Sequence, residues 1–102
     1  MKNTKNTMSI QTEKEVKNNL PKWFNGEVYK EGDTVKNPFS GETYDLTAEE
    51  LSMYDLIKGA EYLLEYKGGV LDPATSGIQR DMIKGLDWFR EHNAKAYMVL
   101  LD

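Results

Sequence analysis

The chain has 102 residues, with 17 acidic and 13 basic side chains, a formal net charge of −4 and no cysteine. This length predicts one domain, and the lack of cysteine excludes disulfides, thiolate metal sites and a cysteine nucleophile. No run of about 18 apolar residues occurs, and the first residues lack the apolar stretch of a secretory signal. We therefore expect a cytoplasmic protein with no membrane partner.

Charge is distributed unevenly along the chain. Residues 1–22 carry five lysines and two glutamates, which gives +3, whereas residues 37–102 carry six basic and twelve acidic side chains, which gives −6. A protein that binds a phosphate backbone needs a basic face, so the acidic body argues against a nucleic-acid partner. The basic stretch is expected to be a solvated tail, with contact to an acidic partner as the alternative.

Residues 1–19 are predicted to form a flexible polar N-terminal arm. Asn, Lys and Thr dominate this stretch, and its four apolar side chains bury too little surface to offset the entropy of ordering. The alternative is a frayed helix from about Ser9 to Asn19, ended at Leu20 because the residue before a proline avoids the helical region. Residues 20–102 are then expected to form a single small domain.

The next stretch, up to residue 45, is predicted to form a small antiparallel meander. Three turn signals built on Gly or Pro follow one another: Asn25-Gly26, Glu31-Gly32-Asp33 and Asn37-Pro38-Phe39-Ser40-Gly41. The expected strands are residues 27–30, 33–36 and 42–45. Gly41 is expected to take a positive φ. Because so small a sheet is marginal alone, we expect aromatic side chains, Phe39 and Tyr44 among them, to pack it against the following helix.

The stretch from Thr47 to Tyr66 carries the clearest helix signal. Thr47 and Glu50 have the spacing of a capping box, in which each side chain bonds the backbone amide of the other residue. Apolar side chains then recur at helical spacing on one face: Met53, Leu56, Ile57, Ala60, Leu63 and Leu64. Gly68 and Gly69 supply the stop.

A second amphipathic helix is predicted to begin near Ser76, after a connection from Gly68, and to end at Asn93 or soon after it. The run from Ala96 to Leu101 is the most apolar of the chain. It is short and β-prone, so we expect a C-terminal strand added to the meander. The expected fold class is therefore α+β: a small antiparallel β-meander plus a C-terminal strand, packed on a two-helix hairpin.

The two predicted helices are similar to each other. Residues 55–63 align with residues 81–89 in charge, in apolar positions and in one glycine. Either a duplication or a coincidence between two amphipathic helices explains the match. A glycine inside a helix costs about 1 kcal/mol against alanine, so we expect another element to approach closely at both Gly59 and Gly85.

No constellation of residues predicts an enzyme. His92 is the only histidine and does not stand at i+3 or i+4 from both of its acidic neighbours, Asp87 and Glu91. The other carboxylates fall on the polar sides of the amphipathic helices, where they are expected to be solvated. We therefore expect no catalytic residue, no cofactor and no metal. A helix-turn-helix is not expected either, because the connection is too long and the second helix mixes charge signs.

The remaining candidate site is a protein-binding surface, because aromatic residues are enriched at such surfaces. The residues predicted to form it are Trp23, Phe24, Tyr29, Tyr54, Tyr62 and Tyr66. The last three fall beside or opposite the apolar stripe of the first long helix. They are exposed if that helix is covered on one side only, and the alternative is that the meander covers them.

Two segments carry a likeness to a known group of proteins. They are Asn37–Glu42 running into Leu46–Leu51, and the ending Trp88–Asp102. They resemble small uncharacterised proteins of tailed phages of marine bacteria, cyanophages among them, over roughly residues 20–102. The resemblance supplies no functional residue and implies at most a protein made in the host cytoplasm during infection.

The function expected from these observations is a non-enzymatic protein-binding module, a phage-encoded modulator of a host protein. The alternative is a small structural or assembly component of a virion that forms a homo-oligomer. The sequence leaves the identity of the partner open.

Overall fold

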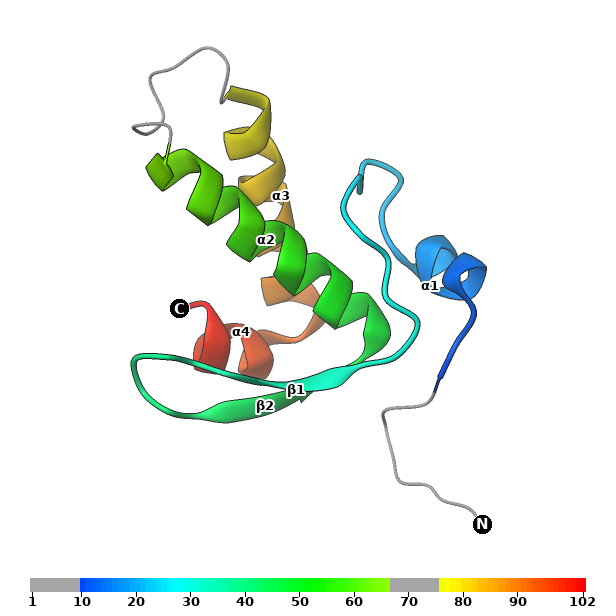
Figure 1. Ribbon diagram of the computed structural model, residues 1–102, viewed down its shortest axis with the longest axis horizontal. Coiled ribbons are helices and arrows are strands. Elements are labelled where there is room, and N and C mark those ends of the chain that lie inside the picture. Colours follow the sequence, from blue (N-terminus) through cyan, green and yellow to red (C-terminus); the bar gives the residue numbers. More distant parts are fainter. Residues whose placement is uncertain (1–9, 67–75) are drawn as a thin grey trace.

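The computed structural model describes residues 10–66 and 76–102, and in these ranges it mixes helices with a small sheet (Figure 1). The helices are α1 (Glu13–Asn19), α2 (Ala48–Tyr66), α3 (Ser76–His92) and α4 (Ala94–Leu100), and the strands are β1 (Asp33–Lys36) and β2 (Thr43–Leu46). The first nine residues of the predicted arm and the connection predicted to begin at Gly68 lie outside the described residues.

α2 is the central element of the fold. α3 runs beside it, α1 flanks it on another side, and the β-hairpin and α4 lie together near its N-terminal end (Figure 1). The predicted capping box forms: the Thr47 amide donates to Glu50 Oε1 at 3.0 Å, and the Glu50 amide donates to Thr47 Oγ1 at 3.3 Å. The helix prediction for this stretch is therefore confirmed.

The sheet has two antiparallel strands, in a register that pairs Asp33 with Leu46 and Lys36 with Thr43. The turn between them adopts the predicted geometry, because Gly41 has a φ of 81°. The prediction of a strand at residues 27–30 is wrong, because these residues form neither a strand nor a helix.

The backbone of residues 27–30 finds hydrogen-bond partners other than a strand. The Tyr29 amide donates to Ser52 Oγ of α2 at 2.9 Å, and the Lys30 carbonyl accepts from the Gln11 amide at 2.6 Å. Buried backbone groups must be paired, and here a helix side chain and the N-terminal segment pair them instead of a neighbouring strand. The β-prone composition of this stretch is overridden by its tertiary surroundings.

The expected C-terminal strand is also wrong, because residues 94–100 form the helix α4. Asn93 caps this helix: its side-chain oxygen accepts from the Ala96 amide at 3.1 Å. Ala96 and Leu100 are buried and stand four residues apart, which places them on one face of a helix. The apolar run does lie against β2, but as a packed helix and not as a paired strand.

For the N-terminal residues, the structure shows the helical alternative from Glu13 to Asn19. Thr12 and Glu15 form a second capping box, and its hydrogen bonds hold the pKa of Glu15 below the ordinary value. Val16 is fully buried and is followed at four-residue spacing by Leu20 and Phe24. Of these three, Val16 lies within α1, and Leu20 and Phe24 follow the end of the helix. Together the three apolar side chains attach a polar helix to α2.

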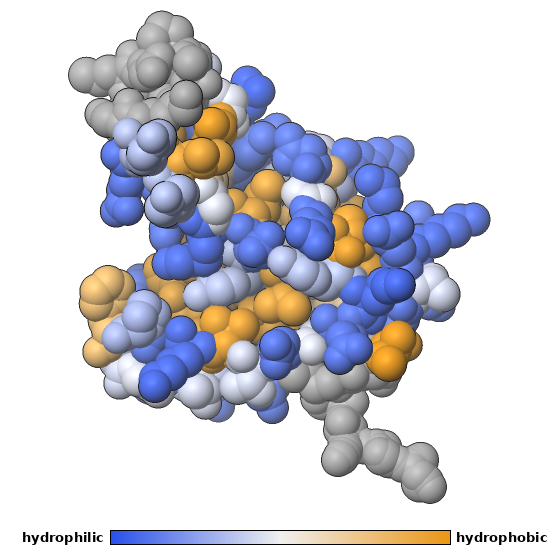
Figure 2. Space-filling view, viewed as in Figure 1, coloured by the Kyte–Doolittle hydropathy of each residue, from blue (hydrophilic) through white to orange (hydrophobic). Residues whose placement is uncertain are grey.

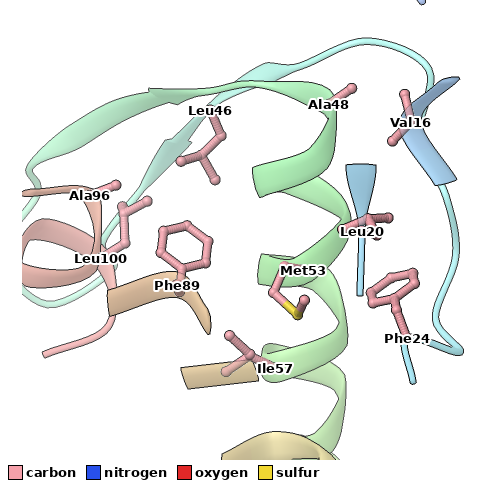
Figure 3. Close-up of a cluster of buried hydrophobic side chains, with 10 residues drawn as sticks. All are labelled: Val16, Leu20, Phe24, Leu46, Ala48, Met53, Ile57, Phe89, Ala96 and Leu100. Atoms are coloured by element: carbon pink, nitrogen blue, oxygen red, sulfur yellow. The ribbon is translucent and has the colours of Figure 1, made fainter. Parts of the chain in front are cut away.

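The hydrophobic core gathers side chains from every helix and from β2 (Figure 3). Phe89 points from α3 into the space between α2 and the hairpin, while Val16, Leu20 and Phe24 lie on the α1 side of α2 (Figure 3). Tyr44 of the hairpin packs against this core, whereas the contact expected from Phe39 is absent, since its side chain is 95% exposed at the turn.

The two helical glycines differ in their surroundings. A Cβ at Gly85 would stand 2.9 Å from Ile57 Cγ1, so the close approach expected there is confirmed. A Cβ at Gly59 would meet no described atom within 4 Å. Gly85 therefore marks the crossing of α2 and α3, and Gly59 serves no contact among the described residues.

Alanine at each glycine is expected to change stability in opposite directions. Gly59→Ala should raise the free energy of unfolding by about 0.5–1 kcal/mol, the usual gain inside a helix. Gly85→Ala has the same gain but overpacks Ile57, so it should be less stable than Gly59→Ala by about 1–3 kcal/mol. Urea denaturation followed by circular dichroism measures both, and equal midpoints would contradict the close contact at Gly85.

Candidate functional site

α2 is apolar on two faces. Its core face is formed by Met53, Ile57, Ala60 and Leu64, all of them buried. At 3.6 residues per turn, a second apolar face lies roughly 130° around the helix from the first. We call this second face, formed by Gly59, Tyr62, Leu63 and Tyr66, the outer face of α2.

The same side of α2 is covered at its N-terminal half. Gly26 lies over Leu56, since a Cβ at Gly26 would meet Leu56 Cδ1 at 3.1 Å, and Ser52 is fully buried beneath Tyr29. Over the C-terminal half, the outer face is open: Leu63 is 40%, Tyr62 66% and Tyr66 78% exposed. The covering segment thus ends where the outer face begins.

The two tyrosines of the outer face form a pair. Their rings are nearly parallel, with an interplanar angle of 10° and centroids 6.4 Å apart. Because they stand one helical turn apart, the backbone of α2 sets their spacing. Stacked aromatic rings lose little side-chain freedom on contact, which suits them to binding another protein.

A groove between α2 and α3 adjoins the outer face and has a volume of about 260 Å³. Its apolar lining comes from Leu56, Gly59, Ala60, Leu63 and Ile78. Its polar lining comes from Asn25, Asp55 and Asp81. We call this feature the α2–α3 groove. Figure 2 shows hydrophobic surface exposed between the C-terminal end of α2 and the N-terminal end of α3, with hydrophilic surface beside it.

The other four predicted site residues are buried or half-buried and line neither the outer face nor the groove. Phe24 is buried in the core, which removes it from any accessible face (Figure 3). Trp23 is half-buried, with Lys84 Nζ 5.7 Å from the centroid of its ring. Tyr54 is half-buried and packs against the core. Tyr29 is half-buried, and burial together with the Asp55 charge raises its pKa.

The structure also brings His92 close to one acidic side chain. His92 Nε2 lies 3.4 Å from Glu50 Oε2, and the imidazole stacks on Trp88 with ring centroids 4.4 Å apart. The buried Glu50 carboxylate is committed to structure, because it accepts from the Thr47 amide and from Asn93 Nδ2. Within residues 10–66 and 76–102, no group of three or more His, Cys, Asp or Glu side chains could hold a metal ion.

The sequence identifies the two tyrosines of the outer face but not the α2–α3 groove. The groove joins Asp55 and Gly59 of one helix to Ile78 and Asp81 of another, and their proximity depends on how the helices cross. The one signal in the sequence that points to the groove is Gly59. A glycine lowers the stability of a helix, and at Gly59 no close contact with a described residue offsets that loss.

The chain was compared with models of protein families, with curated proteins and with solved structures, and none of them matches it. Among the described residues, no helix has both the length and the apolar character needed to cross a bilayer.

Proposed function

We propose that the protein is a non-enzymatic protein-binding module whose contact surface is the outer face of α2. The observation that carries this proposal is the stacked pair of Tyr62 and Tyr66, exposed beside an apolar groove. Tyrosine is among the residues that contribute most binding energy at protein interfaces. Contiguous aromatic and aliphatic surface of this kind is disfavoured in water unless a partner covers it.

Removing the aromatic pair should abolish binding without unfolding the protein. The immobilised wild type is expected to retain one stoichiometric partner from a lysate of its source cells. The Tyr62→Ala/Tyr66→Ala variant is expected to lose that partner, because both rings leave the contact surface. Its free energy of unfolding should change by no more than about 0.5 kcal/mol, since both side chains are exposed. Quantitative mass spectrometry of the bound fraction measures the retention.

Phe39→Ala is the matched control. It also removes an exposed aromatic ring, but from the hairpin turn and not from α2. This variant should retain the partner as the wild type does. Recovery of no partner, or equal recovery with the tyrosine variant, would count against the proposal.

A homo-oligomer is the alternative function, and it would use the same surface. Sedimentation velocity separates the two cases. A second copy of the chain on the outer face would give a species that grows with protein concentration and that disappears in the tyrosine variant. A binding module for another protein would sediment as a monomer in both forms.

A further inference from the structure

The α2–α3 groove carries two carboxylates that form no ion pair with a described residue. Asp55 comes from α2 and Asp81 from α3, and both line the groove beside its apolar side chains. The three ion pairs found among the described residues involve neither of them. Among the described residues, Asp55 accepts a hydrogen bond from the Tyr29 hydroxyl, and Asp81 accepts a long one of 3.4 Å from Asn25 Nδ2. Both carboxylates therefore keep acceptor capacity for a further donor.

The basic side chains of α2 and α3 are directed elsewhere. Lys58 pairs with Glu61 at 2.9 Å, Lys84 lies over the Trp23 ring, and Arg90 pairs with Asp87. Arg80 lies beside Gly77 at the start of α3. The negative charge of the groove is therefore not neutralised by these helices, and the surplus of acidic residues from position 37 onward adds to it.

The size and lining of the groove indicate what could enter it. Its volume of about 260 Å³ is at the lower limit of sites for drug-sized ligands, so it suits one or two side chains of a partner better than a cofactor. Gly59 presents no Cβ at the surface, which lets a partner's backbone approach closely. Lysine and arginine bury their aliphatic stems on apolar surface while their charged ends reach carboxylates.

We propose that the α2–α3 groove binds a protein segment that carries an arginine or lysine flanked by apolar side chains. The cationic group would lie between Asp55 and Asp81, and a neighbouring apolar side chain would cover Gly59 and Leu63. This inference rests on the proposed function and specifies the chemistry of the partner. Tyr62 and Tyr66 would then extend the contact beyond the groove.

The test uses short peptides and amide chemical shifts of the full chain. The cationic probe is acetyl-Leu-Arg-Leu-amide, and the matched neutral probe is acetyl-Leu-Gln-Leu-amide. The cationic peptide should shift the amide signals of Gly59, Leu63 and Asp81 in a saturable way at millimolar concentration. The neutral peptide should bind about fivefold to tenfold more weakly, because partly exposed ion pairs contribute about 0.2–1 kcal/mol each.

Two charge variants distinguish the effect of the groove carboxylates on peptide binding from the effect of the protein's net charge. Asp55→Asn/Asp81→Asn should weaken binding of the cationic peptide to the level of the neutral one. Glu65→Gln/Glu91→Gln removes the same amount of charge from the same two helices, at exposed positions that do not line the groove, and should leave binding unchanged.

Three results would overturn the inference: no saturable shifts, equal binding of the two peptides, or equal losses in both charge variants. Failure of the peptide test would leave the proposed function standing if lysate capture still depended on Tyr62 and Tyr66. Loss of that dependence would remove the proposed function, whatever the peptides show.

Discussion

Replacing Phe89 with alanine is expected to lower the free energy of unfolding by about 3–5 kcal/mol, the cost of a large cavity in a packed core. The Phe89 side chain is fully buried and lies among Leu46, Met53 and Ile57 (Figure 3). Domains of this size have only about 5–15 kcal/mol of stability, so the variant should lose a large part of it. Urea denaturation followed by circular dichroism measures the loss.

Phe39→Ala is the control for this variant, because it makes the same chemical change at a side chain that is 95% exposed. Its free energy of unfolding should stay within about 0.5 kcal/mol of the wild type. Similar losses for the two variants would mean that Phe89 does not occupy the centre of the core.

The second large effect is expected for Glu50→Ala, which should lower the free energy of unfolding by about 2–4 kcal/mol. Glu50 is only 5% exposed, and its carboxylate accepts from the Thr47 amide at 3.0 Å and from Asn93 Nδ2 at 2.9 Å. Asn93 in turn caps α4. One carboxylate therefore links the N-terminal ends of two helices, and its removal leaves partly buried donors without an acceptor.

The capping box of α1 provides the control for the Glu50 variant. Glu15 has the same role toward Thr12 that Glu50 has toward Thr47, but it is exposed to solvent. Water replaces the lost bonds there, so Glu15→Ala should cost clearly less than Glu50→Ala. Thermal unfolding of both variants under the same conditions compares them. Equal losses of stability in the two variants would show that neither the burial of Glu50 nor its hydrogen bond to Asn93 strengthens the capping box of α2.

The sequence was sufficient to predict those helices and turns whose ends are determined by residues close by in the chain. Thr47 and Glu50 mark the start of α2, Ser76 the start of α3, and Gly41 the turn of the hairpin. At the start of α2 and at the hairpin turn, the hydrogen bonds and the backbone angle involve neighbours within a few residues, so the sequence carries the information directly.

The wrong predictions concern segments whose structure depends on distant residues. The apolar tail is a helix because Asn93 caps it and because its buried face meets the side of β2. Residues 27–30 are not a strand because Ser52 and Gln11 satisfy backbone groups there. Propensity within a short window cannot report such partners.

The candidate site was predictable to the extent that it follows helical spacing. That spacing places Tyr62 and Tyr66 off the core stripe of α2, and both side chains are exposed because no described residue covers the outer face there. The burial of Phe24 and the nearness of Asp55 to Asp81 depend on how the N-terminal segment crosses α2 and how α3 packs on it.

The contact between Gly85 and Ile57 has a consequence for the thermodynamics of association. Two helices that meet this closely cannot slide or separate at the crossing without opening a void, which favours a constant width for the α2–α3 groove beside it. A ligand that enters such a rigid site does not have to order it, and little conformational entropy is lost on binding. The heat-capacity change of binding should then reflect the apolar surface covered at the interface, with no added contribution from coupled folding.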